Sequence, residues 1–127
     1  MAVEFKACSK AHQEGQAAEL DACAYLQNHG LTLIESNFRC PCGEIDLIMR
    51  DGDEVVFVEV RLRRQEYLGS AIESVTPSKQ RKLIRTATLY LQKKQWLDRV
   101  NCRFDVIGID EQNQFDWIKN AFSRGFI

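Results

Sequence analysis

The spacing of hydrophobic and polar positions changes along the chain, and each spacing predicts a different kind of element. Apolar and small residues recur at helical spacing over residues 11–28, and Gly30 follows at a position typical of a helix end. A second helix is indicated by a candidate N-cap at Thr76, followed by Pro77 and an apolar stripe. The segments between the helices are short and β-rich. We therefore expect helices over residues 11–28 and 76–96, strands over residues 31–38, 43–49, 54–62 and 102–109, and a short strand or turn over residues 115–122.

The order helix, three strands, helix, strand predicts the α/β class, with a mixed sheet covered by helices. The segment "RDGDE" is a Gly-containing turn, so the strands on either side of it should form an antiparallel hairpin. Residues 54–62 are almost continuously apolar, which is typical of a strand covered on both faces. At 127 residues, the chain is expected to form a single domain over residues 1–127.

Two carboxylates interrupt the apolar pattern of these hairpin strands. Because side chains alternate between the faces of a strand, Asp46 should share a face with Glu44 and Ile48. The opposite face is expected to hold Ile45, Leu47 and Met49. In the next strand, one face should hold Phe57, Glu59 and Arg61, and the other Val56, Val58 and Val60. Pairing across the turn then brings the Asp46 region within a few residues of the Glu59 region, which allows both carboxylates to share a face; the sequence does not fix the register more closely.

Two neighbouring carboxylates in an apolar setting need positive charge nearby, because burial disfavours their ionised forms and each raises the pKa of the other. One source is Arg61, two residues after Glu59, which would form an internal salt bridge. The other is a divalent cation held between the carboxylate oxygens of Asp46 and Glu59. Asp46 is short and sits on a strand, which slightly favours the metal. The spacing of Asp46, Glu59 and Arg61 along the chain often arises by chance, so both sources of positive charge stay open.

Charge is distributed unevenly along the chain. Residues 1–60 carry four Lys or Arg against eleven Asp or Glu, whereas residues 61–100 carry ten against three. The basic block consists of Arg61, Arg63, Arg64, Lys79, Arg81, Lys82 and Arg85. Beside a metal site, such a block suits contacts with a nucleic-acid phosphate backbone. The alternatives are a solvated helix face, or a basic segment that faces the acidic segment of the same chain.

The five cysteines are odd in number and irregularly spaced, so we expect reduced thiols. Cys40 and Cys42 raise the question of a zinc site, with Cys102 or His29 as further ligands. The C-x-C spacing differs from the C-x-x-C of zinc knuckles, so two thiols in a turn are the simpler interpretation. No apolar run approaches the roughly 20 residues that span a bilayer, and the first ten residues lack the apolar stretch of a signal peptide. A cytoplasmic protein without membrane contact is expected.

Four segments together resemble a known family. They are "EGQAAELDACAYLQNHGL", "GEIDLIMRDGDEVVFVEVRLRR", "VTPSKQRKLIRTATLYL" and "CRFDVIGI", and the likeness runs over residues 15–122. The chain thereby resembles the YraN family of small bacterial proteins, which looks like a branch of the PD-(D/E)xK, restriction-endonuclease-like superfamily, similar in shape to Holliday-junction resolvases. The resemblance implies a restriction-endonuclease-like fold with a helix, three strands, helix, strand core.

The resemblance also implies a site. Glu19, Asp46 and Glu59 would hold Mg²⁺ or Mn²⁺, and Arg61 stands where the superfamily has its signature lysine. Arginine cannot act as a base, so Arg61 would bind a phosphate or neutralise Glu59. Glu44 is expected to act as a supporting or salt-bridging residue. Asp105 resembles a family position too, and a hydrogen bond at a strand end is the expected role.

Three functional hypotheses follow. The first is a nucleic-acid-binding protein, a Mg²⁺-dependent endonuclease acting on structured or branched DNA in repair or recombination. The second is a non-catalytic nucleic-acid-binding module with a degenerate nuclease site, in which Arg61 is paired with Glu59. The third is a protein-interaction subunit of a DNA-processing assembly that exposes Trp117 or Phe122. The resemblance to resolvases adds a homodimer as a hypothesis to test.

Overall fold

The computed structural model describes residues 10–62 and 71–123, with side chains from residue 15 onward. The predicted helices and strands are all confirmed, and the last segment is a strand instead of a turn. Along the chain the elements are α1 (Lys10–Asn28), β1 (Thr32–Cys40), β2 (Gly43–Asp51), β3 (Glu54–Leu62), the 3₁₀ turn η1 (Ile72–Ser74), α2 (Pro77–Lys94), β4 (Asn101–Ile109) and β5 (Phe115–Phe122).

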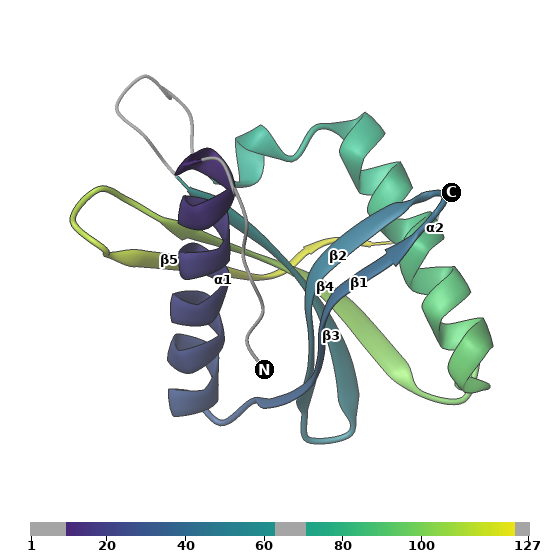
Figure 1. Cartoon of the computed structure of the whole chain (residues 1–127). Helices are drawn as coiled ribbons and strands as arrows, with labels where there is room; N and C mark the ends of the chain where they lie inside the picture. Colours follow the sequence, from purple (N-terminus) through teal and green to yellow (C-terminus); the bar gives the residue numbers. More distant parts are fainter. Residues whose placement is uncertain (1–9, 63–70, 124–127) are drawn as a thin grey trace, which may run out of the picture.

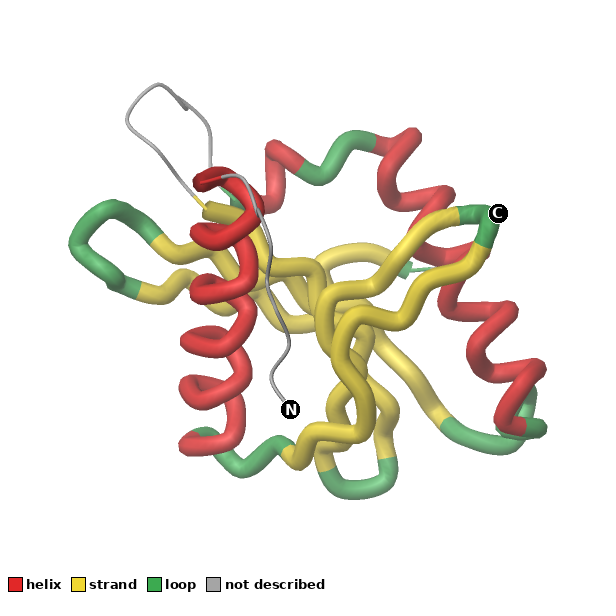
Figure 2. Tube along the Cα trace, in the orientation of Figure 1, coloured by secondary structure: helices red, strands yellow, loops and turns green. Residues whose placement is uncertain are grey.

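The five strands form one mixed sheet in the order β1-β2-β3-β4-β5. All neighbours are antiparallel except β3 and β4, which run parallel because α2 carries the chain back across the sheet between them. Figure 1 shows α1 and α2 on opposite sides of this twisted sheet, and Figure 2 shows the same layers coloured by secondary structure. The α/β class with a mixed sheet between helices is thus confirmed.

The ends of α2 are set by local chemistry. The Thr76 side-chain oxygen accepts a hydrogen bond from the backbone N–H of Lys79 at 3.2 Å, and Pro77 occupies the first turn. At the other end, Gln95 adopts the left-handed conformation with φ of 63°. The N-cap prediction is therefore confirmed. Within the described residues, no helix is both long and apolar enough to cross a membrane.

The core has a layer on each side of the sheet. The layer beneath α1 contains Ala18, Ala22, Cys23, Leu26, Leu31, Leu47, Met49, Val56, Val58, Ile107 and Ile109. The layer beneath α2 contains Phe38, Ile45, Ile48, Val55, Phe57, Ile84, Ala87, Tyr90, Leu91 and Phe104. Strand β3 contributes alternate residues to both layers, which confirms the prediction of a strand covered on both faces.

Strands β2 and β3 do not pair along their full length. Their register runs from Asp51 opposite Glu54 to Leu47 opposite Val58, where the described pairing ends. Beyond that point β2 continues toward α2, and Ile45 packs in the α2-side layer while Leu47 packs in the α1-side layer. The prediction that Ile45 shares a face with Leu47 is therefore wrong. The alternation is broken because the end of the β1–β2 hairpin packs against α2 (Figure 1).

Candidate metal and nucleic-acid site

The candidate site lies where β2 and β3 separate. Just beyond the last described pair, Leu47 opposite Val58, the side chains of Asp46 and Glu59 interact with each other. The Asp46 Oδ2 atom accepts a hydrogen bond of 2.8 Å from the backbone N–H of Val60. The carboxylate thus satisfies a backbone donor near the end of the strand pairing. The prediction that pairing across the turn brings Asp46 close to Glu59 is confirmed.

A third carboxyl group reaches the same place from α1. Ala18 and Ala22 are buried against the sheet, which holds the half-buried Glu19 beside β2. The Glu19 side chain lies within hydrogen-bonding reach of the carboxylate of Asp46 and of the side chain of Asn37. Carboxyl groups from α1, β2 and β3 therefore converge, in agreement with the three residues that the resemblance implied.

The three carboxyl groups hold protons more tightly than ordinary ones. Burial and the neighbouring Asp46 raise the pKa of Glu59 to about 8, although Arg61 and Lys79 act in the opposite direction. Burial and Asp46 also raise the pKa of Glu19 to about 7. Burial raises the pKa of Asp46 as well, and hydrogen bonds from Val60, Glu19 and Glu59 offset part of that effect. Asp46 thus lies between two carboxyl groups whose pKa values are both raised.

Arg61 is held by two partners on the β3 side of the cluster. Its Nη1 donates to Glu59 Oε2 at 3.1 Å, and its Nε donates to Ser74 Oγ at 2.9 Å. The salt-bridged side chains are only 20% and 13% exposed, and Ser74 Oγ in turn donates to the carbonyl of Ala71 at 2.6 Å. The internal salt bridge that the sequence left open is present. Ser74, like Asn37, was missed because nothing in its sequence context marks it as a partner of the site.

No metal position is preformed by this cluster. Among the residues that the structure describes, no three His, Cys, Asp or Glu side chains are arranged to hold a metal ion. One oxygen of Asp46 is occupied by the Val60 N–H, and one oxygen of Glu59 by Arg61. The donors are nonetheless carboxylate oxygens, which suit Mg²⁺ and Mn²⁺. Glu19, Asp46 and Glu59 fit such an ion provided that their protons leave and their side chains reorient.

The basic block is only partly described. Arg63 and Arg64 lie outside the described residues. The α2 members, Lys79, Arg81, Lys82 and Arg85, are exposed on the helix surface. Lys79 lies near enough to Glu59 to lower its pKa. Arg81 and Arg85 instead line a hollow of about 320 Å³ that also contains Cys42. The block therefore extends from the carboxylate cluster toward the end of the β1–β2 hairpin.

Comparison with known proteins identifies the family. The model of a family described as "Uncharacterised protein family UPF0102" matches residues 18–109. The chain belongs to UPF0102. This confirms the resemblance to the YraN family, which is the same group. The match includes all three clustered carboxylates, Arg61 and the α2 part of the basic block.

Curated UPF0102 proteins are similar over most of the chain. One from Coxiella burnetii strain RSA 493 is 53% identical over 107 residues, which is 84% of this chain and 89% of that protein. One from Nitrosomonas eutropha is 49% identical over 117 residues, covering 92% of this chain and 99% of that protein. Another, from Ectopseudomonas mendocina, is 50% identical over 110 residues, covering 85% and 92%. Their descriptions name the family and no activity.

Two further carboxylates have structural roles in this UPF0102 chain. Glu44 forms a surface salt bridge with Arg39 at 3.0 Å. Asp105 is buried, and it accepts hydrogen bonds from Arg103, from the Trp117 indole N–H and from the backbone N–H of Asn120. Asp105 thereby joins β4 to β5, so its role is hydrogen bonding as expected, but it lies in the middle of β4 and not at a strand end.

The aromatic residues expected at a protein-interaction surface are half-buried instead of exposed. Trp117 donates to Asp105 and lies edge-on to Tyr25, while Phe122 stacks on Phe104 with ring centroids 4.9 Å apart. Trp117 packs against the α1-side layer, and Phe122 packs against the α2-side layer. The prediction that they are exposed is therefore wrong.

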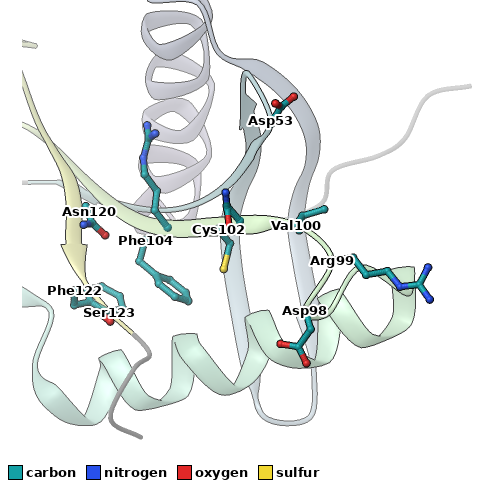
Figure 3. Close-up of a pocket in the computed structure, with 11 residues that line it drawn as sticks. Asp53, Asp98, Arg99, Val100, Cys102, Phe104, Asn120, Phe122 and Ser123 are labelled. Atoms are coloured by element: carbon teal, nitrogen blue, oxygen red, sulfur yellow. The ribbon is translucent and has the colours of Figure 1, made fainter.

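The structure separates the residues considered for zinc. The Sγ atoms of Cys40 and Cys42 are 2.9 Å apart. Cys102 instead lines a hollow of about 700 Å³ between β4, β5 and the loop after α2, and neither Cys40 nor Cys42 lines that hollow (Figure 3). His29 contacts the Tyr25 carbonyl at the end of α1. Among the described residues, no group of three His, Cys, Asp or Glu side chains could hold a metal ion, so neither Cys102 nor His29 completes a zinc site with the two thiols.

Proposed function

We propose that this protein is a nucleic-acid-binding protein of restriction-endonuclease-like fold, and that it is a Mg²⁺-dependent endonuclease acting on structured or branched DNA. The observation that carries the proposal is the convergence of Glu19, Asp46 and Glu59 at the separation of β2 and β3. The element order and the strand order β1-β2-β3-β4 support the fold assignment, since the resemblance implies that core. UPF0102 membership alone names no activity.

Charge balance supports a cation at this site. Three carboxylates would carry three negative charges, whereas the cations known to act on the cluster are Arg61 and Lys79, on Glu59. The cluster therefore retains protons near neutral pH or takes up a divalent ion in their place. A bound Mg²⁺ or Mn²⁺ would supply an acidified water and would neutralise negative charge developing on a scissile phosphodiester.

The chain's own residues would then take distinct roles. The Val60 N–H holds the Asp46 carboxylate in place on a rigid strand, so Asp46 would offer the ion an oxygen at a fixed position. Arg61 is tied to Glu59 and Ser74, so it orients the Glu59 carboxylate and does not deprotonate water. Lys79 is exposed at the start of α2 and near Glu59, which suits it to contact a substrate phosphate. The remaining α2 cations would contact the phosphate backbone in a sequence-independent way.

The decisive experiment compares Mg²⁺ binding and cleavage in the same variants. Calorimetry measures Mg²⁺ binding, and plasmid, flap and four-way-junction substrates measure cleavage. Asp46→Ala should abolish both, because it removes the central oxygen donor. Asp53→Asn, an exposed aspartate in the β2–β3 turn, is the matched control and should change neither. Unchanged binding and cleavage in Asp46→Ala would overturn the metal site.

A second candidate function is a non-catalytic nucleic-acid-binding module. The Arg61–Glu59 salt bridge at 3.1 Å favours it, because it neutralises Glu59 without a metal. Here affinity for DNA or RNA should survive EDTA, fall steeply with salt, and weaken when Lys79 and Lys82 are changed to Gln. The loss of each phosphate contact should reduce the salt slope by about one. Metal-dependent cleavage by the unaltered protein would exclude this candidate.

A further inference from the structure

Two thiols meet at the end of the β1–β2 hairpin, outside the carboxylate cluster. Cys40 ends β1 and pairs in register with Gly43 at the start of β2, so only Pro41 and Cys42 form the turn. The Cys40 and Cys42 Sγ atoms are 2.9 Å apart, and neither cysteine is in a disulfide. The two sulfur atoms are thus already in contact before any reaction.

The surroundings keep the thiols together. Pro41 has a fixed φ, which restricts the conformations of the turn between the two cysteines. The end of the hairpin also packs tightly against α2. Gly43 lies so close to this helix that an added Cβ atom would be 2.9 Å from Thr86 Oγ1. Phe38 and Ile45, on either side of the turn, are buried in the α2-side layer. The contact between the sulfur atoms is therefore maintained by packing at both ends of the turn.

Cys40 and Cys42 differ in how readily they form thiolates. Burial acts to raise the pKa of the Cys40 thiol, but hydrogen bonds with Cys42, Thr86 and the Gly43 backbone together lower it below its ordinary value. The hydrogen bond with Cys40 is the main cause of the raised pKa of Cys42. Both thiols are half-buried, and Cys42 lines a hollow, so a small oxidant can reach them. This division suits one attacking and one resolving cysteine.

We propose that Cys40 and Cys42 form a reversible redox site, in which a peroxide oxidises the two thiols to an intramolecular disulfide. The Cys40 thiolate attacks one peroxide oxygen, the O–O bond breaks, and Cys40 becomes a sulfenic acid while hydroxide leaves. The Cys42 sulfur then attacks the Cys40 sulfur, the S–O bond breaks, and water is released. In sum, two thiols and one hydrogen peroxide give one disulfide and two waters, so electrons and atoms balance.

The same geometry makes the oxidised form easy to reduce. A disulfide between cysteines separated by one residue closes a short ring, and deviation from the preferred disulfide geometry stores strain. Strained and accessible disulfides have higher reduction potentials than structural ones. A dithiol reductant should therefore restore both thiols rapidly.

The test follows the two thiols on one peptide. Trypsin cleavage after Arg39 and Arg50 releases residues 40–50, which contain Cys40 and Cys42 and none of the other cysteines. After peroxide treatment of the intact protein and alkylation of free thiols, mass spectrometry should show this peptide unalkylated and lighter by both thiol hydrogens. Treatment with dithiothreitol before alkylation should restore the doubly alkylated peptide.

Single variants assign the two roles. In Cys42→Ser, oxidation should stop at a Cys40 sulfenic acid that dimedone traps, whereas Cys40→Ser should give markedly less adduct. Cys102→Ser is the matched control, because Cys102 lines a different hollow, and it should leave the result unchanged. Circular dichroism confirms that each variant is folded.

Several outcomes would overturn the proposal. Disulfides between chains, or direct conversion of Cys40 to sulfinic acid, would show that Cys42 does not resolve the intermediate. Equal trapping in the two variants would contradict the assigned roles. Stoichiometric Zn²⁺ bound through both thiols, with resistance to peroxide, would make the pair a metal site. None of these readouts depends on cleavage of nucleic acid.

Discussion

Asp46 stabilises the fold through a backbone hydrogen bond and destabilises it through repulsion between carboxylates. Its carboxylate accepts the Val60 N–H, yet it lies between Glu19 and Glu59 and raises the pKa of both. Deprotonation of the neighbours therefore places like charges together in a partly desolvated gap. Sites that store such repulsion commonly exchange stability for function.

We predict that Asp46→Asn stabilises the protein when no divalent ion is present. The Asn side-chain oxygen still accepts the Val60 N–H, while the negative charge is removed. The free energy of unfolding in EDTA at pH 8 should rise by about 0.5–2 kcal/mol, as measured by urea denaturation. If the proposed site is correct, Mg²⁺ should stabilise the unaltered protein and should no longer stabilise the variant. A variant less stable than the unaltered protein in EDTA would contradict the repulsion argument.

At the scale of elements, the end of the β1–β2 hairpin depends on a close approach to α2. Gly43 has φ of 153° and lies against the Thr86 hydroxyl, which itself donates to the Lys82 carbonyl at 2.8 Å. The α2 residue Thr86 is completely buried at this contact, so it has little room to move. Packing here holds β2 on the path that takes it away from β3.

We predict that Gly43→Ala destabilises the protein by about 1–3 kcal/mol, because the added Cβ would lie 2.9 Å from Thr86 Oγ1 and the backbone φ is unfavourable for alanine. Gly52→Ala is the matched control, since Gly52 has φ of 63° and an added Cβ there meets nothing within 4 Å. Gly52→Ala should lower the free energy of unfolding only through the unfavourable backbone φ at this position. Thr86→Ala in the Gly43→Ala background should recover part of the loss. Chemical denaturation measures all of these differences, and equal costs for the two glycine variants would refute the contact.

For the whole molecule, the carboxylate cluster links stability to pH. The groups that face it are Arg61, Lys79, Glu44 and Asn37. The pKa of Glu59 is raised from 4.5 to about 8, and that of Glu19 from 4.5 to about 7. At pH values between 4.5 and these raised values, the folded state therefore binds more protons than the unfolded state. The stability that these protons confer is full below pH 4.5 and is lost as pH rises through about 7 and 8.

We therefore predict that, without divalent ions, the cluster's contribution makes the free energy of unfolding fall as pH rises from about 5 to about 8. Mg²⁺ affinity should rise over the same interval, because binding displaces protons. Thermal unfolding with EDTA or Mg²⁺ at several pH values measures both effects. The Glu19→Gln, Glu59→Gln double variant should flatten the profile. A profile unchanged in that variant would assign the pH dependence to other groups.

The sequence by itself determined the elements, because hydrophobic period, caps and turns are local properties. Thr76 with Pro77 indicated the start of α2, and the continuous apolar run of β3 indicated a strand covered on both sides. It also placed Asp46 within a few residues of Glu59, since a short turn makes the two strands antiparallel neighbours, although it did not fix their register. Glu19 was located only through the family resemblance, because its own spacing does not distinguish it from a solvated helix residue.

Only the tertiary structure decided how these pieces meet. Contact between Glu19 and Asp46 depends on how α1 packs across the sheet, and the choice of Arg61 partners depends on Ser74, which η1 brings back from beyond β3. The separation of β2 from β3 and the changed side of Ile45 follow from packing of the hairpin end on α2. Such contacts join residues far apart in the chain, so no local pattern of residues encodes them.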